Sequence, residues 1–76
     1  MPNPCFGIYR AVVRSNADPE RRRRLQVDVP DLGVLGAWAE ACLSARASKS
    51  PSPNATVWVM FEAGDPQRPV WLGRQV

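Results

Sequence analysis

The segment at residues 57 to 73, VWVMFEAGDPQRPVWLG, restricts the possible folds of this chain more than any other part of it. Its β-branched and aromatic start favours a strand. A half-exposed strand has one polar face, but here Val57, Val59 and Phe61 occupy one alternating side while Trp58 and Met60 occupy the other. The segment therefore predicts a strand whose second apolar face is covered by something outside the strand's own sheet.

The length of 76 residues predicts one domain, residues 1–76, with a small core. Disulfides, metals or association with other chains commonly support domains of this size. The chain has no histidine, and Cys5 and Cys42 lie too far apart for a zinc motif. A pairing of these cysteines stays possible, but reduced, mostly buried thiols are favoured. We expect no metal and no cofactor.

Five short apolar segments, separated by turn-forming residues, are predicted to be strands. They are Phe6 to Arg14, Arg24 to Val29, Gly36 to Ala45, Thr56 to Glu62 and Arg68 to Arg74. The third also has helical spacing, and the small size of the domain and its neighbouring strands decide for a strand. The polar residues 45 to 55 form a loop. The pattern indicates a small all-β barrel or sandwich, and closing the sheet would remove its exposed edges.

The charge is modest but unevenly placed, with ten basic and seven acidic residues and a net charge of +3. Four of the basic residues form the run Arg21 to Arg24, which could neutralise phosphates. A solvated turn balanced by Asp18, Glu20 and Asp28 is the favoured interpretation. The N-terminus lacks the pattern of a secretory signal, and no stretch of about 18 apolar residues occurs. We expect a soluble, non-exported protein without a membrane anchor.

The residues that catalysis commonly requires are missing, so we expect no enzyme and no catalytic residues. There is no histidine to act as a base, no glycine-rich phosphate loop and no cluster of metal ligands. Glu62 and Asp65 could be imagined as the carboxylate pair of a glycosidase. The simpler interpretation is that Asp65 begins a turn with Pro66, while Glu62 ends a strand and pairs with a nearby arginine.

An ordered set of short motifs runs along nearly the whole chain. In order they are Gly7 and Tyr9, Asp18-Pro19, Arg24 with Val27, Val29 and Pro30, Trp38-Ala39, Cys42, Pro51, Val57-Trp58-Val59, Phe61-Glu62, Gly64-Asp65-Pro66, and Pro69-Val70-Trp71 with Gly73. This set resembles the OB-fold domain of contractile-tail baseplate spike proteins and baseplate assembly protein V of phages, which is related to type VI secretion spikes. Arg22 and Arg23 stand where the family has a glycine, and Asn54 replaces another.

The resemblance implies a five-stranded OB-fold barrel with a structural role at the baseplate. Such a domain is expected to form a homotrimer that docks on the tail hub protein and carries or seals the spike protein. The β-helical spike and the lysozyme domain of some relatives are expected on other chains. The expected location is the tail baseplate of the virion, with assembly in the host cytoplasm.

The candidate site residues are those expected to contact other proteins: Tyr9, Arg21, Arg22, Arg23, Arg24, Trp38, Trp58, Met60 and Trp71. Asp18, Pro19, Gly64, Asp65 and Pro66 are expected to shape turns. The predicted barrel core is Val27, Val29, Val57, Val59, Phe61, Val70 and Leu72. The alternative function is a module that binds single-stranded nucleic acid, with bases stacked on Tyr9, Trp38, Trp58 and Trp71 and with Arg10, Arg14 and the arginine run holding the backbone.

Overall fold

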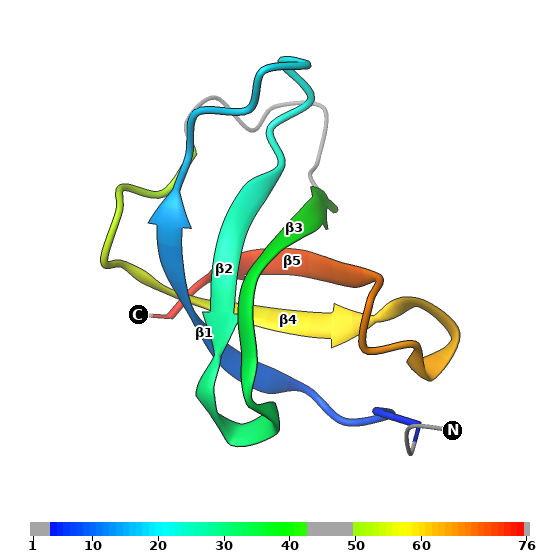
Figure 1. Cartoon of the computed structure of the whole chain (residues 1–76). Helices are drawn as coiled ribbons and strands as arrows, with labels where there is room; N and C mark the ends of the chain where they lie inside the picture. The colour runs from blue at the N-terminus through cyan, green and yellow to red at the C-terminus, as the bar shows by residue number, and fades with distance from the viewer. Residues whose placement is uncertain (1–3, 43–49, 76) are drawn as a thin grey trace.

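The computed structural model describes residues 4–42 and 50–75 of the chain (Figure 1). Its strands are β1 (Tyr9–Ser15), β2 (Leu25–Val29), β3 (Val34–Ala41), β4 (Thr56–Phe61) and β5 (Pro69–Arg74). Two short 3-10 turns, η1 (Pro30–Leu32) and η2 (Glu62–Gly64), follow β2 and β4. In the described part of the chain, no helix is long and apolar enough to cross a membrane.

The five strands close into a barrel in the order β1-β2-β3-β5-β4, with β4 returning to β1. Every neighbouring pair is antiparallel except β3 with β5, which is parallel. Because the sheet closes on itself, hydrogen bonding between strands satisfies most of the backbone without a long free edge. The predicted all-β, five-stranded OB-fold barrel is confirmed.

The ambiguous third segment is a strand, as predicted, although it begins at Val34 rather than at Gly36. Cross-strand pairing decides the matter, since Gln26 lies opposite Trp38 and Val27 opposite Ala37. The predicted end of this strand and the first half of the following polar loop fall on residues 43–49, which lie outside the described residues.

The barrel core contains five of the seven predicted residues: Val27, Val29, Val57, Val59 and Phe61. The prediction for Val70 and Leu72 is wrong, because β5 turns the opposite alternation inward and buries Pro69 and Trp71. The pairing with β4 explains this. Phe61 lies opposite Pro69 and Val59 opposite Trp71, and directly paired residues of antiparallel strands point to the same face.

The backbone is left-handed at two of the positions where the sequence departs from the family, and this was expected at Asn54 alone. Asn54 has a φ of 73°, as expected for the residue that replaces a glycine there. Arg23, at the other such position, has a φ of 60°. Gly64 has a φ of 74° in the η2 turn, and the ring of Phe6 lies where its Cβ would be. These three turns therefore have a left-handed backbone, whether the residue there is a glycine or not.

Candidate protein interface

The outward side chains of β4 and β5, together with Ile8 just before β1, form an apolar surface that we call the outer face. Its members are Ile8, Trp58, Met60, Val70 and Leu72. Met60 lies directly opposite Val70, so the two share this face. Ile8 is 55% exposed and Met60 43% exposed, while the other members are partly buried. The outward side of β4 is therefore only partly covered by the described residues.

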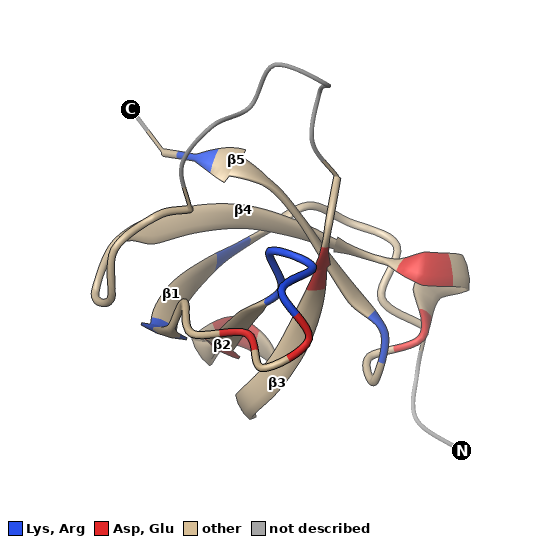
Figure 2. Cartoon of the chain, turned by 90° about the horizontal axis from the view of Figure 1, so that it is seen from above, with Lys and Arg blue, Asp and Glu red and all other residues tan. Residues whose placement is uncertain are grey.

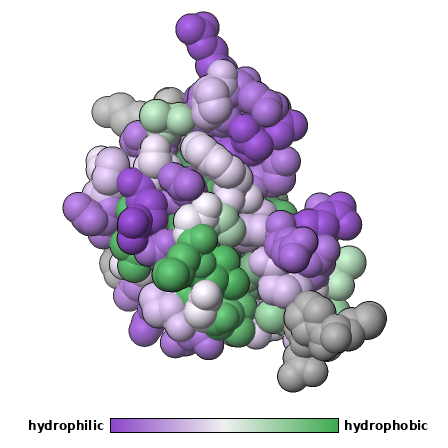
Figure 3. Space-filling view, in the orientation of Figure 1, coloured by the Kyte–Doolittle hydropathy of each residue, from purple (hydrophilic) through white to green (hydrophobic). Residues whose placement is uncertain are grey.

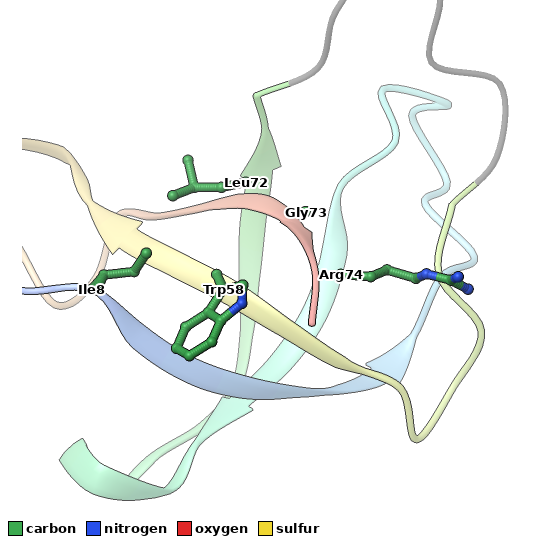
Figure 4. A pocket seen from close by; sticks show the side chains of 5 residues that line it. All are labelled: Ile8, Trp58, Leu72, Gly73 and Arg74. Carbon is green, nitrogen blue, oxygen red and sulfur yellow. The ribbon is translucent and has the colours of Figure 1, made fainter. Parts of the chain in front are cut away.

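A groove of about 430 Å³ runs across the outer face between Ile8, Trp58 and Leu72 (Figure 4). An irregularity in the β4–β5 register makes room for it, because it places Gly73 rather than Leu72 opposite Trp58. No atom lies within 4 Å of the position that a Cβ would occupy at Gly73. The groove therefore exists because the residue across from a tryptophan has no side chain.

Two arginines give the groove a positive rim. The guanidinium of Arg10, which lies opposite Trp58 in the β1–β4 ladder, is 5.2 Å from the centre of the Trp58 ring. Arg74 lines the groove at the end of β5, and its guanidinium points away from Trp58, beyond the edge of the groove (Figure 4). Neither makes an ion pair with any described residue. The chemistry of this surface is therefore apolar in the middle and cationic at the edge, as is common at protein interfaces.

The predicted interface residues divide between this face, the interior of the barrel and the region of the arginine loop. Trp58 and Met60 point outward and form part of the outer face. Tyr9 is half-buried, and its ring contacts Phe61 edge-on with a centroid distance of 5.6 Å. The prediction that Trp71 contacts a partner is wrong, because its side chain is only 2% exposed. Its indole N–H donates to the carbonyl of Arg23 at 2.9 Å, which fastens the arginine loop to the core.

Contact of Arg24 with a partner stays a prediction, and within the chain its guanidinium is bound to the β1–β2 loop. Its Nε and Nη2 donate to the two carboxylate oxygens of Asp18 at 3.1 and 2.9 Å. The guanidinium also lies 5.2 Å from the centre of the Trp38 ring, on the neighbouring part of β3. Trp38 is consequently half-buried beneath this arginine and lies off the outer face.

Asp18 is the main hydrogen-bond acceptor of the loop that contains Pro19. Besides Arg24, its carboxylate accepts hydrogen bonds from the backbone N–H groups of Glu20, Arg22 and Arg24. The side-chain bond from Arg24, helped by these backbone donors and opposed by partial burial, holds the pKa of Asp18 well below its ordinary value. The charges of Asp18 and Arg24 therefore neutralise each other within the loop.

The rest of the arginine run lies at one end of the barrel, close to acidic residues (Figure 2). Arg22 contacts the carboxylates of Glu20 and Glu40, each at 3.3 Å. Arg21 is exposed and has a φ of 54°. The solvated turn that was favoured from the sequence describes this loop better than a phosphate-binding run does.

Asp65 accepts two hydrogen bonds in the turn between β4 and β5. The backbone N–H of Gln67 donates to the carboxylate of Asp65, and that of Arg68 donates to the Asp65 carbonyl. Pro66 follows in the turn, and Glu62 pairs with Arg68 at 2.6 Å, as expected. The two carboxylates therefore have structural partners that account for their positions.

The sequence interpretation missed three exposed apolar residues. Phe6 and Ile8 were assigned to a strand, but β1 begins only at Tyr9, and they are 73% and 55% exposed. Leu35 lies at the start of β3, where the register with β2 shifts, and is 78% exposed. Long apolar side chains next to glycines, at Gly7 and Gly36, were the available signal. Glycine often marks the place where a strand stops or bulges.

The described residues offer little for a metal or for a disulfide. They contain no group of three or more acidic, histidine or cysteine side chains that could hold a metal ion. No disulfide joins Cys5 and Cys42. Cys5 is buried, as expected, whereas Cys42 is exposed at the end of β3, so the prediction of mostly buried thiols holds for one of the two.

The surface proposed for nucleic acid is not assembled as one groove. Trp71 is inside the barrel, Trp38 lies against Arg24, and Arg14 pairs with Asp28 at 2.8 Å. On the outer face, the cation–π contact of Arg10 with Trp58 remains. Binding of nucleic acid stays an alternative prediction.

A search of the curated proteins found no match to the chain. A model of a protein family matches residues 9–75, which span all five strands. The family is described as the type VI secretion system and phage-baseplate injector OB domain. With the closed barrel, this match establishes the resemblance seen in the motifs: the chain belongs to the baseplate injector OB-domain family.

Proposed function

We propose that this protein, a structural component of a phage baseplate or a type VI injector, is the adaptor between the tail hub and the central spike. In this role the barrel is a trimer that carries the threefold symmetry of the spike onto the hub and helps to close the channel. The work is mechanical, so no step of it requires a catalytic residue or a cofactor. The proposed location is the baseplate of the assembled particle.

The observation that carries the proposal is the outer face, which the described residues cover only in part. Trp58 and Met60 are large apolar side chains on a strand whose opposite side already forms the core. Contiguous exposed apolar surface on a small domain commonly marks a place where another protein binds. Association there also supplies the buried apolar area that a 76-residue chain lacks when alone.

The test is co-purification from cells that express the chain with the hub and spike proteins of its own baseplate gene cluster. The wild-type chain should be recovered with both proteins, and its mass in the complex should correspond to three copies. Met60→Glu places a carboxylate in the contact and should reduce recovery of at least one partner about tenfold or more. Ser52→Glu, an equally exposed change on the loop before β4, serves as the matched control and should leave recovery unchanged.

Two outcomes would contradict the proposal. One is recovery of the complex by the Met60 variant at the wild-type level. The other is a chain that ignores hub and spike but binds a labelled single-stranded oligonucleotide with a steep dependence on salt, which would favour the nucleic acid module instead.

A further inference from the structure

The turn between β2 and β3, together with the first two residues of β3, carries the most exposed large apolar residue of the described chain. We call residues 31 to 35 the tip. Leu35 is 78% exposed there, and Figure 3 shows hydrophobic surface gathered over this turn. Asp31, at the start of the tip, is exposed and makes no ion pair with the described residues. The tip therefore combines a bare leucine with an unneutralised carboxylate.

A bulge holds Leu35 away from the barrel. The β2–β3 register shifts between Val27 and Val29, and Gly36 takes a φ of 66°. Two side chains hold the backbone of Gly36 in place. The Asp28 carboxylate accepts a hydrogen bond from the Gly36 N–H at 2.7 Å, and the Gln26 amide donates one to the Gly36 carbonyl at 3.2 Å. Bulges fixed in this way aim a side chain in a set direction. The leucine is thus presented on a rigid support before any partner arrives.

The groove on the outer face has the opposite chemistry. Its walls are Ile8, Trp58 and Leu72, its floor is open at Gly73, and Arg10 and Arg74 at its edge have no carboxylate partner among the described residues. A tip with one apolar side chain and one negative charge matches a groove that is apolar inside and positive outside.

We propose that the tip of one copy of this chain inserts into the groove of the next copy, with Leu35 beside Trp58 and Asp31 near the two arginines. This inference rests on the proposed function in one respect, the trimer, and names the contact that would build it. Each copy gives a tip to one neighbour and receives a tip from the other. Such a head-to-tail contact forms a closed ring when the rotation between copies is right.

The charges and the geometry both favour contact between different surfaces over contact between identical ones. Two grooves facing each other across a twofold axis would bring Arg10 and Arg74 against the same arginines, which is repulsive. Within one chain Asp31 makes no ion pair with Arg10 or Arg74, and the bulge fixes the tip on β2 and β3 while Trp58, Leu72 and Gly73 place the groove on β4 and β5. A second copy is therefore needed to bring the two features together.

Two variants allow a decisive mixing experiment. Leu35→Glu spoils the tip and leaves the groove intact. Gly73→Leu fills the groove and leaves the tip intact, and it should fold because space is open around Gly73 and its φ is not left-handed. Thermal unfolding of each isolated variant, followed by circular dichroism, checks that the barrel is preserved.

The masses in solution, from light scattering after size-exclusion chromatography, give the result. The wild-type chain should form trimers. Each variant alone should be monomeric, because every contact between two of its copies would lack either an intact tip or an intact groove. An equal mixture of the variants should form one-to-one dimers and nothing larger, since a single intact tip meets a single intact groove. A charge exchange provides an independent check: Asp31→Arg should weaken association at least about tenfold, and Arg74→Asp in the same chain should restore it.

A mixture that stays monomeric while the wild-type chain is trimeric would overturn the tip-and-groove contact and leave the trimeric adaptor standing. A wild-type chain that is monomeric at all concentrations up to its solubility limit would also overturn it. The adaptor role would then be decided separately by recovery with hub and spike, which does not depend on contact between copies.

Discussion

Replacing Trp71 by phenylalanine should strongly destabilise the barrel, whereas the same replacement at Trp58 should not. Trp71 is 2% exposed, and its indole N–H donates to the Arg23 carbonyl. The substitution removes that bond and leaves the carbonyl without its donor, which costs about 1–2 kcal/mol. The smaller ring also leaves a gap in the core, which costs about 1 kcal/mol more.

The expected total is a loss of about 2–3 kcal/mol in the free energy of unfolding. A chain of this size has a total stability of the order of 4–11 kcal/mol, so the loss is a large fraction. The midpoint of thermal unfolding should fall by about 10 °C or more. Urea unfolding followed by far-ultraviolet circular dichroism is the suitable assay, because it does not depend on tryptophan fluorescence.

Trp58→Phe is the matched control. Trp58 lies on the outer face and has a cation–π contact with Arg10, worth about 0.5–1 kcal/mol at an exposed site. Its loss should change stability by no more than about 1 kcal/mol while weakening association with partners. The reverse pattern, with a stable Trp71 variant that no longer assembles and a Trp58 variant that unfolds easily, would refute the assignment of Trp71 to the core.

Three further predictions concern the turns. Gly33→Ala should lower the free energy of unfolding by about 1 kcal/mol, because Gly33 has a left-handed backbone. Gly64→Ala should lower it by more than this, because Gly64 is also left-handed and its Cβ would lie 2.6 Å from the Phe6 ring. Urea unfolding measures both changes. Ala63→Gly should stabilise the chain by about 0.5 kcal/mol in the same assay, since Ala63 has a φ of 53°. Asp18→Asn should flatten the acid side of the pH–stability curve, because the lowered pKa of Asp18 gives stability that is present above about pH 4 and is lost as the pH falls below it.

Matched changes separate these effects from general damage. The extra cost of Gly64→Ala should disappear in a Phe6→Ala background if the ring is its cause. Ala17→Gly, at an exposed position outside the left-handed region, should destabilise rather than stabilise. Arg24→Gln, which removes the guanidinium that lowers the pKa of Asp18, should flatten the acid limb as well, and an acid limb that neither substitution changes would contradict the role of the Asp18 network.

The sequence predicts the hairpin of β4 and β5 well, because its signals agree. The alternation in β4 is strong on the inner side, and Asp65 with Pro66 marks the turn. The inner side of β5 was predicted wrongly for a physical reason. Both alternations of this strand are apolar, one with Val70 and Leu72 and the other with Trp71, so the pattern has no polar side. Only the pairing with β4 determines which side enters the core.

The groove could not be predicted from the pattern either. It depends on the irregular register that brings Gly73 opposite Trp58, and register between strands is a tertiary property. The exposure of Leu35 depends in the same way on a bulge held by Asp28 and Gln26. The sequence indicated that a second apolar face existed and needed cover. It could not give the shape of that face.

The arginines show how clustering in sequence can mislead about contact. The run from Arg21 to Arg24 suggested a charged surface for a partner, yet Arg24 is held by Asp18, and Arg22 by Glu20 and Glu40. Arg10 and Arg74 stand alone in the sequence and are far apart along it, but they flank one groove and lack carboxylate partners among the described residues. A carboxylate near a pair of unneutralised arginines gains more than one near arginines already paired, because neutralised cations attract weakly. Electrostatic attraction of an acidic partner is therefore expected at the barrel wall rather than at the arginine-rich loop.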